Sequence, residues 1–343
     1  FTCYLYSGAS LNVTSPGGMI TAAPAVVVYG NSSTPALFVT NSGTLNGNIS
    51  ISGTMSGGVT NNAGGVISGD IDNKYNSVIS GASGITNNGL ITGNILNSGS
   101  ISNGGITNGG TITGGIVSSG SISNAGITND GTITGAISLY GGKGSSFSGS
   151  LTNTGQIGGG ISNFGTIGGS ISNSGTITGG ISNGVTVGGT ISNGIVNSGT
   201  INGGITNTDG IAISGTINNG IVNRGTINGG ITNGAAGSNT SGTINGGITN
   251  TGAINGTINL AGSTLNLNGT SGSVNGQILG GKGTVNVNGT YTRSAGNEIN
   301  VANFNLDSAG VLNFAASESV TAGNTQLAGT LGVGSGVTAT FNG

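Results

Sequence analysis

Isoleucine and valine recur along the middle of the chain at two alternating intervals. Between residues 157 and 200 the apolar positions step by four and then by six, at 157, 161, 167, 171, 177, 181, 187 and 191. Both intervals are even, and even intervals place side chains on one side of an extended strand. Neither interval fits an amphipathic helix, which would also be destabilised by so much internal glycine. The pattern predicts short strands whose Ile columns form a core.

A larger repeat combines two of these segments. Ile91, Ile112 and Ile133 are each 21 residues apart. Triplets of the form Asn-x-Gly, such as 163–165, separate the apolar segments and are typical of tight turns. Equivalent strands of successive coils would lie about 4.8 Å apart, so that equivalent residues stack. We therefore predict an all-β fold, a right-handed parallel β-helix (solenoid) with coils of about 20–21 residues.

Asparagine follows the same rhythm. It recurs every ten residues at Asn153, Asn163, Asn173, Asn183 and Asn193. Stacked amides can hydrogen-bond along a column, and Asn tolerates the left-handed backbone conformation found at corners. We expect these residues to have a structural role, while outward-facing Asn, Ser and Thr form a neutral surface.

Changes in composition predict three parts. Residues 1–40 are the least repetitive and are expected to form an N-terminal cap with the first irregular coils, or simply a divergent first coil. Residues 41–260 form the Gly/Asn/Ile-rich β-helix repeats. Residues 261–343 form C-terminal coils with a fuller core, since they carry larger apolar residues: Phe304, Leu306, Leu312, Phe314, Leu331 and Phe341.

The composition excludes several classes of protein. The 343 residues include 77 Gly but only 3 Pro, so the chain is not collagen. Its regular Ile and Val spacing and net charge of -2 do not fit a disordered chain. Five Lys and Arg give no basic footprint, and we expect no nucleic-acid partner. A single cysteine cannot form an intramolecular disulfide, and no apolar run is long enough for a transmembrane helix.

The repeats carry a resemblance. GTITGGISN at 175–183 and GTINGGITN at 225–233 and 242–250 resemble the passenger repeats of type V secretion autotransporters of Gram-negative bacteria, especially self-associating AIDA-type adhesins. The resemblance extends over about residues 40–343 and is one of repeat style. It implies export across the outer membrane, a location at the cell surface or in the medium, and cell–cell aggregation and biofilm formation through homotypic association. Membrane attachment would come only from a C-terminal barrel that this sequence lacks.

The alternative, from a different functional class, is a host-directed toxin or a passenger that binds a host receptor, glycan or matrix protein. A toxin should carry a membrane-active apolar segment outside the stack, and Val26–Val28 is too short for one. The sequence favours self-association over this alternative because so few charges are present to repel a second copy.

Reactive chemistry has little support in the sequence. There is no His, the seven acids are scattered, and Asp70 with Asp72 is the closest pair. The segment DIDNKYNS lacks the later Gly and Glu of a calcium loop, so calcium binding there is a weak hypothesis. We expect no enzyme activity, no catalytic or metal-binding residues and no cofactor.

Candidate binding residues lie in two interruptions of the repeat, at 70–78 and 138–147. We expect both to be corner insertions, where extra residues leave the inward columns intact. Exposed aromatic side chains at such corners offer contact area at low entropic cost. The candidates are Asp70, Asp72, Lys74, Tyr75, Tyr140, Lys143 and Phe147.

Overall fold

The computed structural model describes residues 1–14, 17–33, 35–123, 125–142, 146–184, 188–208, 215–234, 242–269, 272–294 and 298–343. Every regular element in these ranges is a β-strand. The strands form a parallel β-solenoid of about 15 turns, with coils about 21 residues apart. The predicted parallel β-helix is therefore confirmed. The described chain divides into two compact units, Phe1–Ser170 and Ile171–Gly343.

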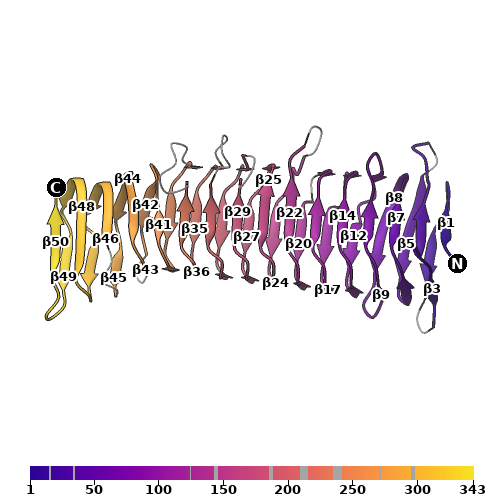
Figure 1. Cartoon of the computed structure of the whole chain (residues 1–343), viewed down its shortest axis with the longest axis horizontal. Coiled ribbons are helices and arrows are strands. Elements are labelled where there is room, and N and C mark those ends of the chain that lie inside the picture. Colours follow the sequence, from indigo (N-terminus) through magenta and orange to yellow (C-terminus); the bar gives the residue numbers. More distant parts are fainter. Residues whose placement is uncertain are drawn as a thin grey trace. The chain divides into compact units, whose positions relative to one another are not determined.

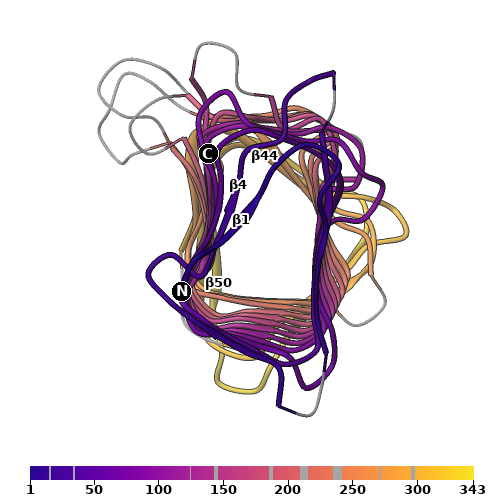
Figure 2. The ribbon, with the colours of Figure 1, turned by 90° about the vertical axis from the view of Figure 1, so that its right-hand side faces the viewer.

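A typical coil of the first unit has four short strands, which correspond to two near-decamers. They are β13 (Leu90–Ile91), β14 (Ile95–Asn97), β15 (Ser100–Ile101) and β16 (Ile106–Asn108). The next strand, β17 (Thr111–Ile112), pairs with β13 in parallel, and Ile91 lies opposite Ile112. This pairing confirms the repeat of 21 residues. Figure 1 shows successive strands of this unit side by side, and in Figure 2 its coils, drawn from indigo to magenta, overlie one another.

The strands of the first unit fall into four stacks, one for each side of the coil. The stack of β13 and β17 also holds β3 (Met19–Thr21), β6 (Thr44–Asn46), β9 (Val66–Ile67), β21 (Thr132–Ile133) and β24 (Gln156–Ile157). The stack of β14 holds β1 (Cys3–Leu5), β4 (Val26–Val28), β7 (Ile49–Ile51), β10 (Ile71–Asn73), β18 (Ile116–Ser118), β22 (Ile137–Tyr140) and β25 (Ile161–Phe164). The stack of β15 holds β11 (Val78–Ile79), β19 (Ser121–Ile122) and β26 (Thr166–Ile167). The stack of β16 holds β2 (Leu11–Val13), β5 (Ala36–Asn41), β8 (Thr54–Asn61), β12 (Gly84–Asn87), β20 (Ile127–Asn129) and β23 (Leu151–Asn153).

The second unit repeats this plan and ends in longer strands. One side holds β28 (Thr176–Ile177), β32 (Thr200–Ile201), β36 (Thr226–Asn228), β40 (Ala253–Asn255), β43 (Gly272–Asn275), β45 (Thr290–Arg293), β47 (Val311–Phe314) and β49 (Thr330–Val333). The next sides hold β29 (Ile181–Asn183), β33 (Ile205–Asn207), β37 (Ile231–Asn233) and β41 (Ile258–Asn259), then β30 (Thr190–Ile191), β34 (Thr216–Ile217) and β38 (Thr243–Ile244). The fourth side holds β27 (Ile171–Asn173), β31 (Ile195–Asn197), β35 (Ile221–Asn223), β39 (Ile248–Asn250) and β42 (Thr264–Leu267). The long strands are β44 (Ile278–Val287), β46 (Glu298–Leu306) and β48 (Glu318–Leu327), and the last strand is β50 (Ala339–Asn342).

The Ile columns form the core, as the even spacing predicts. Of the eight apolar positions from 157 to 191, all except Val187 are described and buried, and Val187 lies outside the described residues. In strands of the repeat such as β27, the middle residue, here Ser172, points outward and is half-buried, while its two neighbours are buried. Inward and outward positions therefore alternate along such strands.

The C-terminal coils bury larger side chains, but only up to the last turn. Phe304 and Phe314 are buried. Leu331 and Phe341 are half-buried. The Phe341 ring nevertheless packs against both core rings, with centroids 6.3 Å from Phe304 and 6.4 Å from Phe314. The extent of the fuller core over residues 261–343 stays a prediction.

The first forty residues form coils in register with the rest of the first unit. Cys3 pairs with Val26, and Val26 pairs with Ile49, all in parallel. Val26–Val28 is buried on both faces of its strand and belongs to the core. This arrangement matches the divergent first coil of the two alternatives raised by the sequence. The predicted boundaries near 40 and 260 stay predictions.

Buried asparagines form hydrogen-bonded columns, which we call the inner Asn ladders. In the first unit Asn87 Nδ2 donates to Asn108 Oδ1, and Asn108 Nδ2 donates to Asn129 Oδ1, both at 2.7 Å. The prediction of stacked amides is thus confirmed for Asn153, whose Oδ1 accepts from Asn129 at 2.7 Å. In the second unit Asn173 donates to Asn197 Oδ1 at 2.8 Å. Amide groups thereby satisfy one another in a core that excludes water.

Asn193 does not belong to this ladder, contrary to the ten-residue rhythm. It is exposed, and the ladder position is taken by Asn197. The reason is that residues 192–193 form a turn directly after the two-residue strand β30, whereas Asn197 ends the three-residue strand β31. Equal spacing along the chain therefore places Asn residues at two different kinds of corner.

Candidate functional site

The candidate site lies in the first unit, at the corner that follows β10, β14, β18 and β22. In a regular coil this corner is Asn-x-Gly, as in 97–99. Gly99 and Gly120 occupy equivalent positions, and a Cβ on Gly120 would collide with the carbonyl oxygen of Gly99. Close approach of the backbones therefore requires glycine here. The same glycines leave this part of the corner without side chains.

Both interruptions predicted from the sequence are insertions at this one corner. From Asn97 to Ile101 the regular corner spans four residue steps, from Asn73 to Ile79 it spans six, and from Leu139 to Phe147 it spans eight. The register shows that these positions are equivalent, because Asn73 pairs with Asn97 and Ser118 pairs with Leu139. The structure thus confirms both interruptions as corner insertions and brings them to the same edge.

The first insertion forms a tight turn that projects Tyr75. Ser77 N donates to Lys74 O at 3.0 Å, which closes the turn. Asn76 takes the left-handed backbone conformation, with a φ of 62°. Ser77 is buried, and its Oγ donates to Ile51 O at 2.9 Å. Tyr75 stands at the tip of this anchored turn with 78% of its surface exposed.

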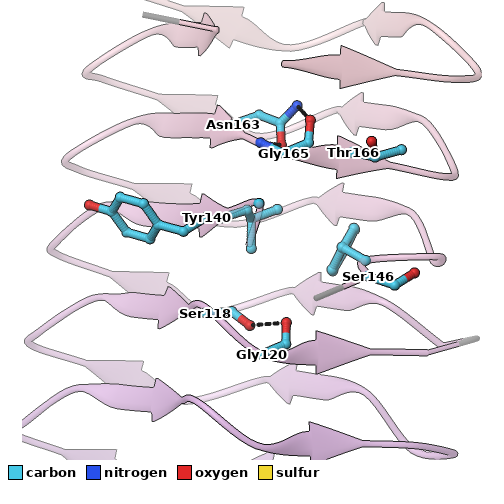
Figure 3. Close-up of a pocket in the computed structure, with 10 residues that line it drawn as sticks. Ser118, Gly120, Tyr140, Ser146, Asn163, Gly165 and Thr166 are labelled. Carbon is cyan, nitrogen blue, oxygen red and sulfur yellow. Dashed lines mark hydrogen bonds between the residues drawn. The ribbon is translucent and has the colours of Figure 1, made fainter. Parts of the chain in front are cut away.

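The second insertion begins with Tyr140, which stacks on an aromatic neighbour. Tyr140 pairs with Phe164 of the next coil. Their ring centroids are 5.0 Å apart and their planes differ by 14°. Figure 3 shows Tyr140 projecting from its coil, with Ser118 and Gly120 on one side and Asn163 and Gly165 on the other. The stack on Phe164 holds the Tyr140 ring at this corner.

A shallow groove lies beside the first insertion, and we call it the corner groove. It is lined by Tyr75–Val78, Ser98–Ser100 and Ser119–Ser121. A separate hollow of only about 10 Å³ is lined by residues that include Ser118, Tyr140 and Asn163. Ser98 and Ser119 are exposed on the floor, and Ser119 Oγ lies 3.4 Å from Ser98 Oγ. The groove therefore combines one aromatic side chain, Tyr75, with a floor of hydroxyl and backbone groups.

Phe147 does not belong to an exposed surface. Only 7% of its surface is accessible, and it bridges Ile122 and Ile167 in the stack of β15. It thus fills a position that isoleucine holds in the neighbouring coils, so the expectation of an exposed Phe147 is wrong. The inserted residues precede it, and Lys143 among them lies outside the described residues.

The inner Asn ladder is interrupted beneath the groove. Asn97 Nδ2 donates to Ser118 Oγ at 3.0 Å, so that a hydroxyl replaces the next amide. One coil further on, the same position is Leu139, which is buried. A leucine cannot pass on a hydrogen bond, and the ladder therefore stops at the coil that carries Tyr140.

The acidic candidates lie away from the groove floor. Asp70 precedes β10, and its Oδ1 accepts from Asn94 N at 2.7 Å and from Asn94 Nδ2 at 3.2 Å. Asp72 faces outward in the middle of β10. Burial raises the pKa of the Asp72 carboxyl, Lys74 opposes this shift and Asp70 adds to it. The described ranges contain no group of three residues suited to hold a metal ion. Asp70 thus has a structural role as an acceptor for a neighbouring corner.

Three exposed tyrosines of the first coils were not singled out from the sequence. Tyr29 stacks on Tyr4 at 6.3 Å and on Tyr6 at 5.7 Å between ring centroids. Tyr4 and Tyr6 are two residues apart and so share one face of a strand. That spacing is the signal that could have revealed them, but the partner Tyr29 follows only from the pairing of β1 with β4.

The second unit carries amide columns on its surface. We call Asn202, Asn228, Asn255 and Asn275 the outer amide column. Nδ2 of each of the last three donates to Oδ1 of the preceding residue, at 2.9, 2.8 and 2.9 Å. A side-chain amide has two N–H donors and two acceptor lone pairs. Asn228 and Asn255, the two middle members of the outer amide column, each use one N–H and one lone pair for the hydrogen bonds along the column. The column therefore presents a repeated, uncharged pattern of donors and acceptors.

Comparisons with known proteins give no match: no protein-family model, curated protein or solved structure is significantly similar to this chain. Nor does the part of the chain that the structure describes include a helical segment with the length and hydrophobicity needed to cross a membrane.

Proposed function

We propose that this protein is a surface-displayed bacterial adhesin that mediates cell–cell aggregation and biofilm formation by binding further copies of itself. The outer amide column is the observation that carries the proposal. Its members repeat once per coil, so a second copy that presents the same column meets several complementary groups at once. The parallel β-solenoid is compatible with the passenger domain of an autotransporter, and the AIDA-type repeat style supports that assignment.

Charge supports association between identical copies. The chain carries five Lys and Arg and seven Asp and Glu among its 343 residues. Two of these charges, Arg293 and Glu318, form a buried ion pair at 2.6 Å and contribute little to the surface. Like-charge repulsion between two copies is therefore small.

The strength of association follows from repetition. A single hydrogen bond between exposed groups contributes about 0.5 kcal/mol net, which is negligible alone. After a first contact each further contact is intramolecular, so a column of equivalent groups adds up by effective concentration. Binding should be reversible, should increase steeply with the number of coils, and should depend little on salt because few charges take part.

Sedimentation velocity of the purified chain over a range of concentrations tests the proposal. We expect oligomers that grow with concentration equally at low and high salt, and clumping of cells that display the chain. The double variant Asn228→Asp/Asn255→Asp should weaken association by introducing like charges, whereas Asn228→Ser/Asn255→Ser keeps the column neutral and should weaken it less. A chain that stays monomeric at high concentration, on cells that stay dispersed, contradicts the proposal.

A further inference from the structure

We propose that the peptide unit Asn202–Gly203 deamidates spontaneously, which turns the first member of the outer amide column into a carboxylate and weakens self-association. The covalent step stands on its own, and its effect on association rests on the proposed function. All four members of the column are followed by glycine: Asn202–Gly203, Asn228–Gly229, Asn255–Gly256 and Asn275–Gly276. Glycine has no side chain that hinders attack by its backbone nitrogen on the preceding side chain, so each pair is a candidate for this reaction.

The reaction consumes water and releases ammonia. The glycine backbone nitrogen loses its proton to a solvent base and attacks Cγ of the asparagine, which forms a C–N bond and closes a ring. The tetrahedral intermediate collapses, the bond from Cγ to Nδ2 breaks, and Nδ2 takes a proton and leaves as ammonia. Water then opens the succinimide at Cγ to give aspartate, or at the main-chain carbonyl carbon to give isoaspartate. The step needs only water and ordinary proton transfer.

Asn202 has the freedom that this attack requires. It lies in a bend just beyond the strand β32, whereas Asn228 and Asn255 are the last residues of β36 and β40. Asn202 is exposed, while the other three members of the column are half-buried. The glycine nitrogen reaches Cγ by rotation about backbone and side-chain bonds, and the hydrogen bonds of a paired strand oppose that rotation. Asn202 should therefore react before the other members.

The hydrogen bonds of the column leave both nitrogens of this unit available. Gly229 N donates to Asn255 O at 2.8 Å, so the nucleophile that would attack Asn228 is occupied. Asn228 Nδ2 donates along the column, which holds that leaving group in place. Among the residues that the structure describes, neither Gly203 N nor Asn202 Nδ2 has a hydrogen-bond partner. Both nitrogens can exchange protons with water, as the attack and the loss of ammonia require.

The column also activates the carbonyl group that is attacked. Asn202 Oδ1 accepts a hydrogen bond from Asn228 Nδ2 at 2.9 Å. This donor withdraws electron density from Cγ, and it faces the oxygen on which negative charge develops in the tetrahedral intermediate. Asn202, as the first member, receives this bond without giving one to the column. The end of the column thus combines an activated carbonyl group with a free leaving group.

The product changes the column without dismantling it. A carboxylate at position 202 still accepts from Asn228, and that hydrogen bond becomes charge-assisted. The carboxylate cannot donate, and it adds negative charge to a column that is otherwise neutral. Two copies that meet through these columns therefore each lose a donor and repel each other at this end. Association should become weaker and should depend on salt, unlike that of the fresh chain.

Peptide mass spectrometry of the full chain, incubated over weeks in buffer made with heavy-oxygen water, tests the covalent step. Each deamidation replaces the amide group by a hydroxyl whose oxygen comes from the solvent. We expect Asn202 to convert at least about tenfold faster than Asn228 and Asn255. These two are matched controls in the same column, because the nitrogens of the glycines that follow them donate at 2.8 and 3.0 Å. Conversion of Asn202 that is no faster than theirs, or no conversion at all, overturns the proposal.

Two variants test the consequence for association. Asn202→Asp imitates the aspartate product and should weaken self-association about three- to tenfold at low salt, with most of the loss recovered at high salt. Asn202→Ser cannot form the succinimide, stays neutral and can still accept from Asn228, so it should associate as the fresh wild type does and lose no affinity over the same incubation. Replacing Gly203 is unsuitable, because a Cβ there would lie 2.6 Å from the carbonyl carbon of Gly179.

The failures of the two proposals are distinguishable. If Asn202 converts as expected but even the fresh chain does not self-associate, the proposed function fails and the modification site stands. If the fresh chain associates and Asn202 stays intact, the modification site is overturned and the proposed function stands. If the incubated wild type, with Asn202 converted, associates as tightly as Asn202→Ser, the link between deamidation and association is overturned.

Discussion

Replacing one member of the inner Asn ladder should loosen its coil far more than a typical surface change. Asn108 is fully buried in the first unit. Its Oδ1 accepts from Asn87 at 2.7 Å, and its Nδ2 donates to Asn129 Oδ1 at 2.7 Å and to Thr132 O at 3.2 Å. Asn108→Ala removes all of these bonds and leaves the Asn129 oxygen without its donor.

The magnitude follows from those contacts. Two net amide–amide hydrogen bonds contribute about 1 kcal/mol each, and an orphaned buried acceptor costs about 1–3 kcal/mol more. The sum is roughly 3–5 kcal/mol of local stability. Since 1.4 kcal/mol is a factor of ten, amide hydrogen exchange of the coils around residue 108 should accelerate by about two to three and a half orders of magnitude. Hydrogen exchange is the appropriate assay because repeat stacks unfold locally and global unfolding need not be two-state.

Two further variants make the test specific. Asn108→Ser introduces the residue that the chain itself uses at Ser118, where a hydroxyl accepts from the preceding amide at 3.0 Å and donates to Gly120 O at 3.3 Å. We expect it to retain much of the protection. Asn108→Asp keeps the shape but buries a negative charge, and should be the worst of the three at neutral pH. If Ala and wild type exchange at equal rates, or if Ser is worse than Ala, the ladder does not stabilise the coil in the way argued.

Three other changes test different parts of the fold. Ile171→Asp places an unpaired charge in a fully buried column and should lower the free energy of unfolding by more than about 4 kcal/mol, as measured in thermal or proteolytic assays. The outward-facing change Ser172→Asp should be nearly neutral. The opposite result would mean that Ser172, and not Ile171, faces the core. Arg293→Met leaves Glu318 buried without its partner at 2.6 Å and should lower the free energy of unfolding by about 3–5 kcal/mol. The double variant Arg293→Met/Glu318→Leu should be more stable than that single variant. If the losses of the two single variants simply add in the double variant, this account is contradicted. Burial raises the pKa of Tyr291 from 10.0 to about 12, so the second unit should lose stability between those pH values as the unfolded phenol ionises first. Circular-dichroism melts should show that loss, and Tyr291→Phe should lack it.

Much of the architecture was predictable because its cause is local. Even spacing of Ile fixes which side of a strand each residue faces, and a repeat of 21 residues fixes which residues stack, as Ile91 and Ile112 do. Both relations depend only on distance along the chain. They were sufficient for the fold class, for the buried columns from Ile157 to Ile191 and for the stacking of Asn side chains.

The site needed the register of the whole first unit. The sequence showed that the segments around Tyr75 and Tyr140 interrupt the repeat, but not that both interruptions stand at one corner, since that depends on how many residues every intervening turn contains. Because turn lengths add up in the same way, Asn197 and not Asn193 occupies the ladder position next to Asn173. It also placed Phe147 in an isoleucine column between Ile122 and Ile167. The chain alone determined which residues face inward, and only the stacked coils decided which distant residues meet, because lateral pairing sums the lengths of all the turns between them.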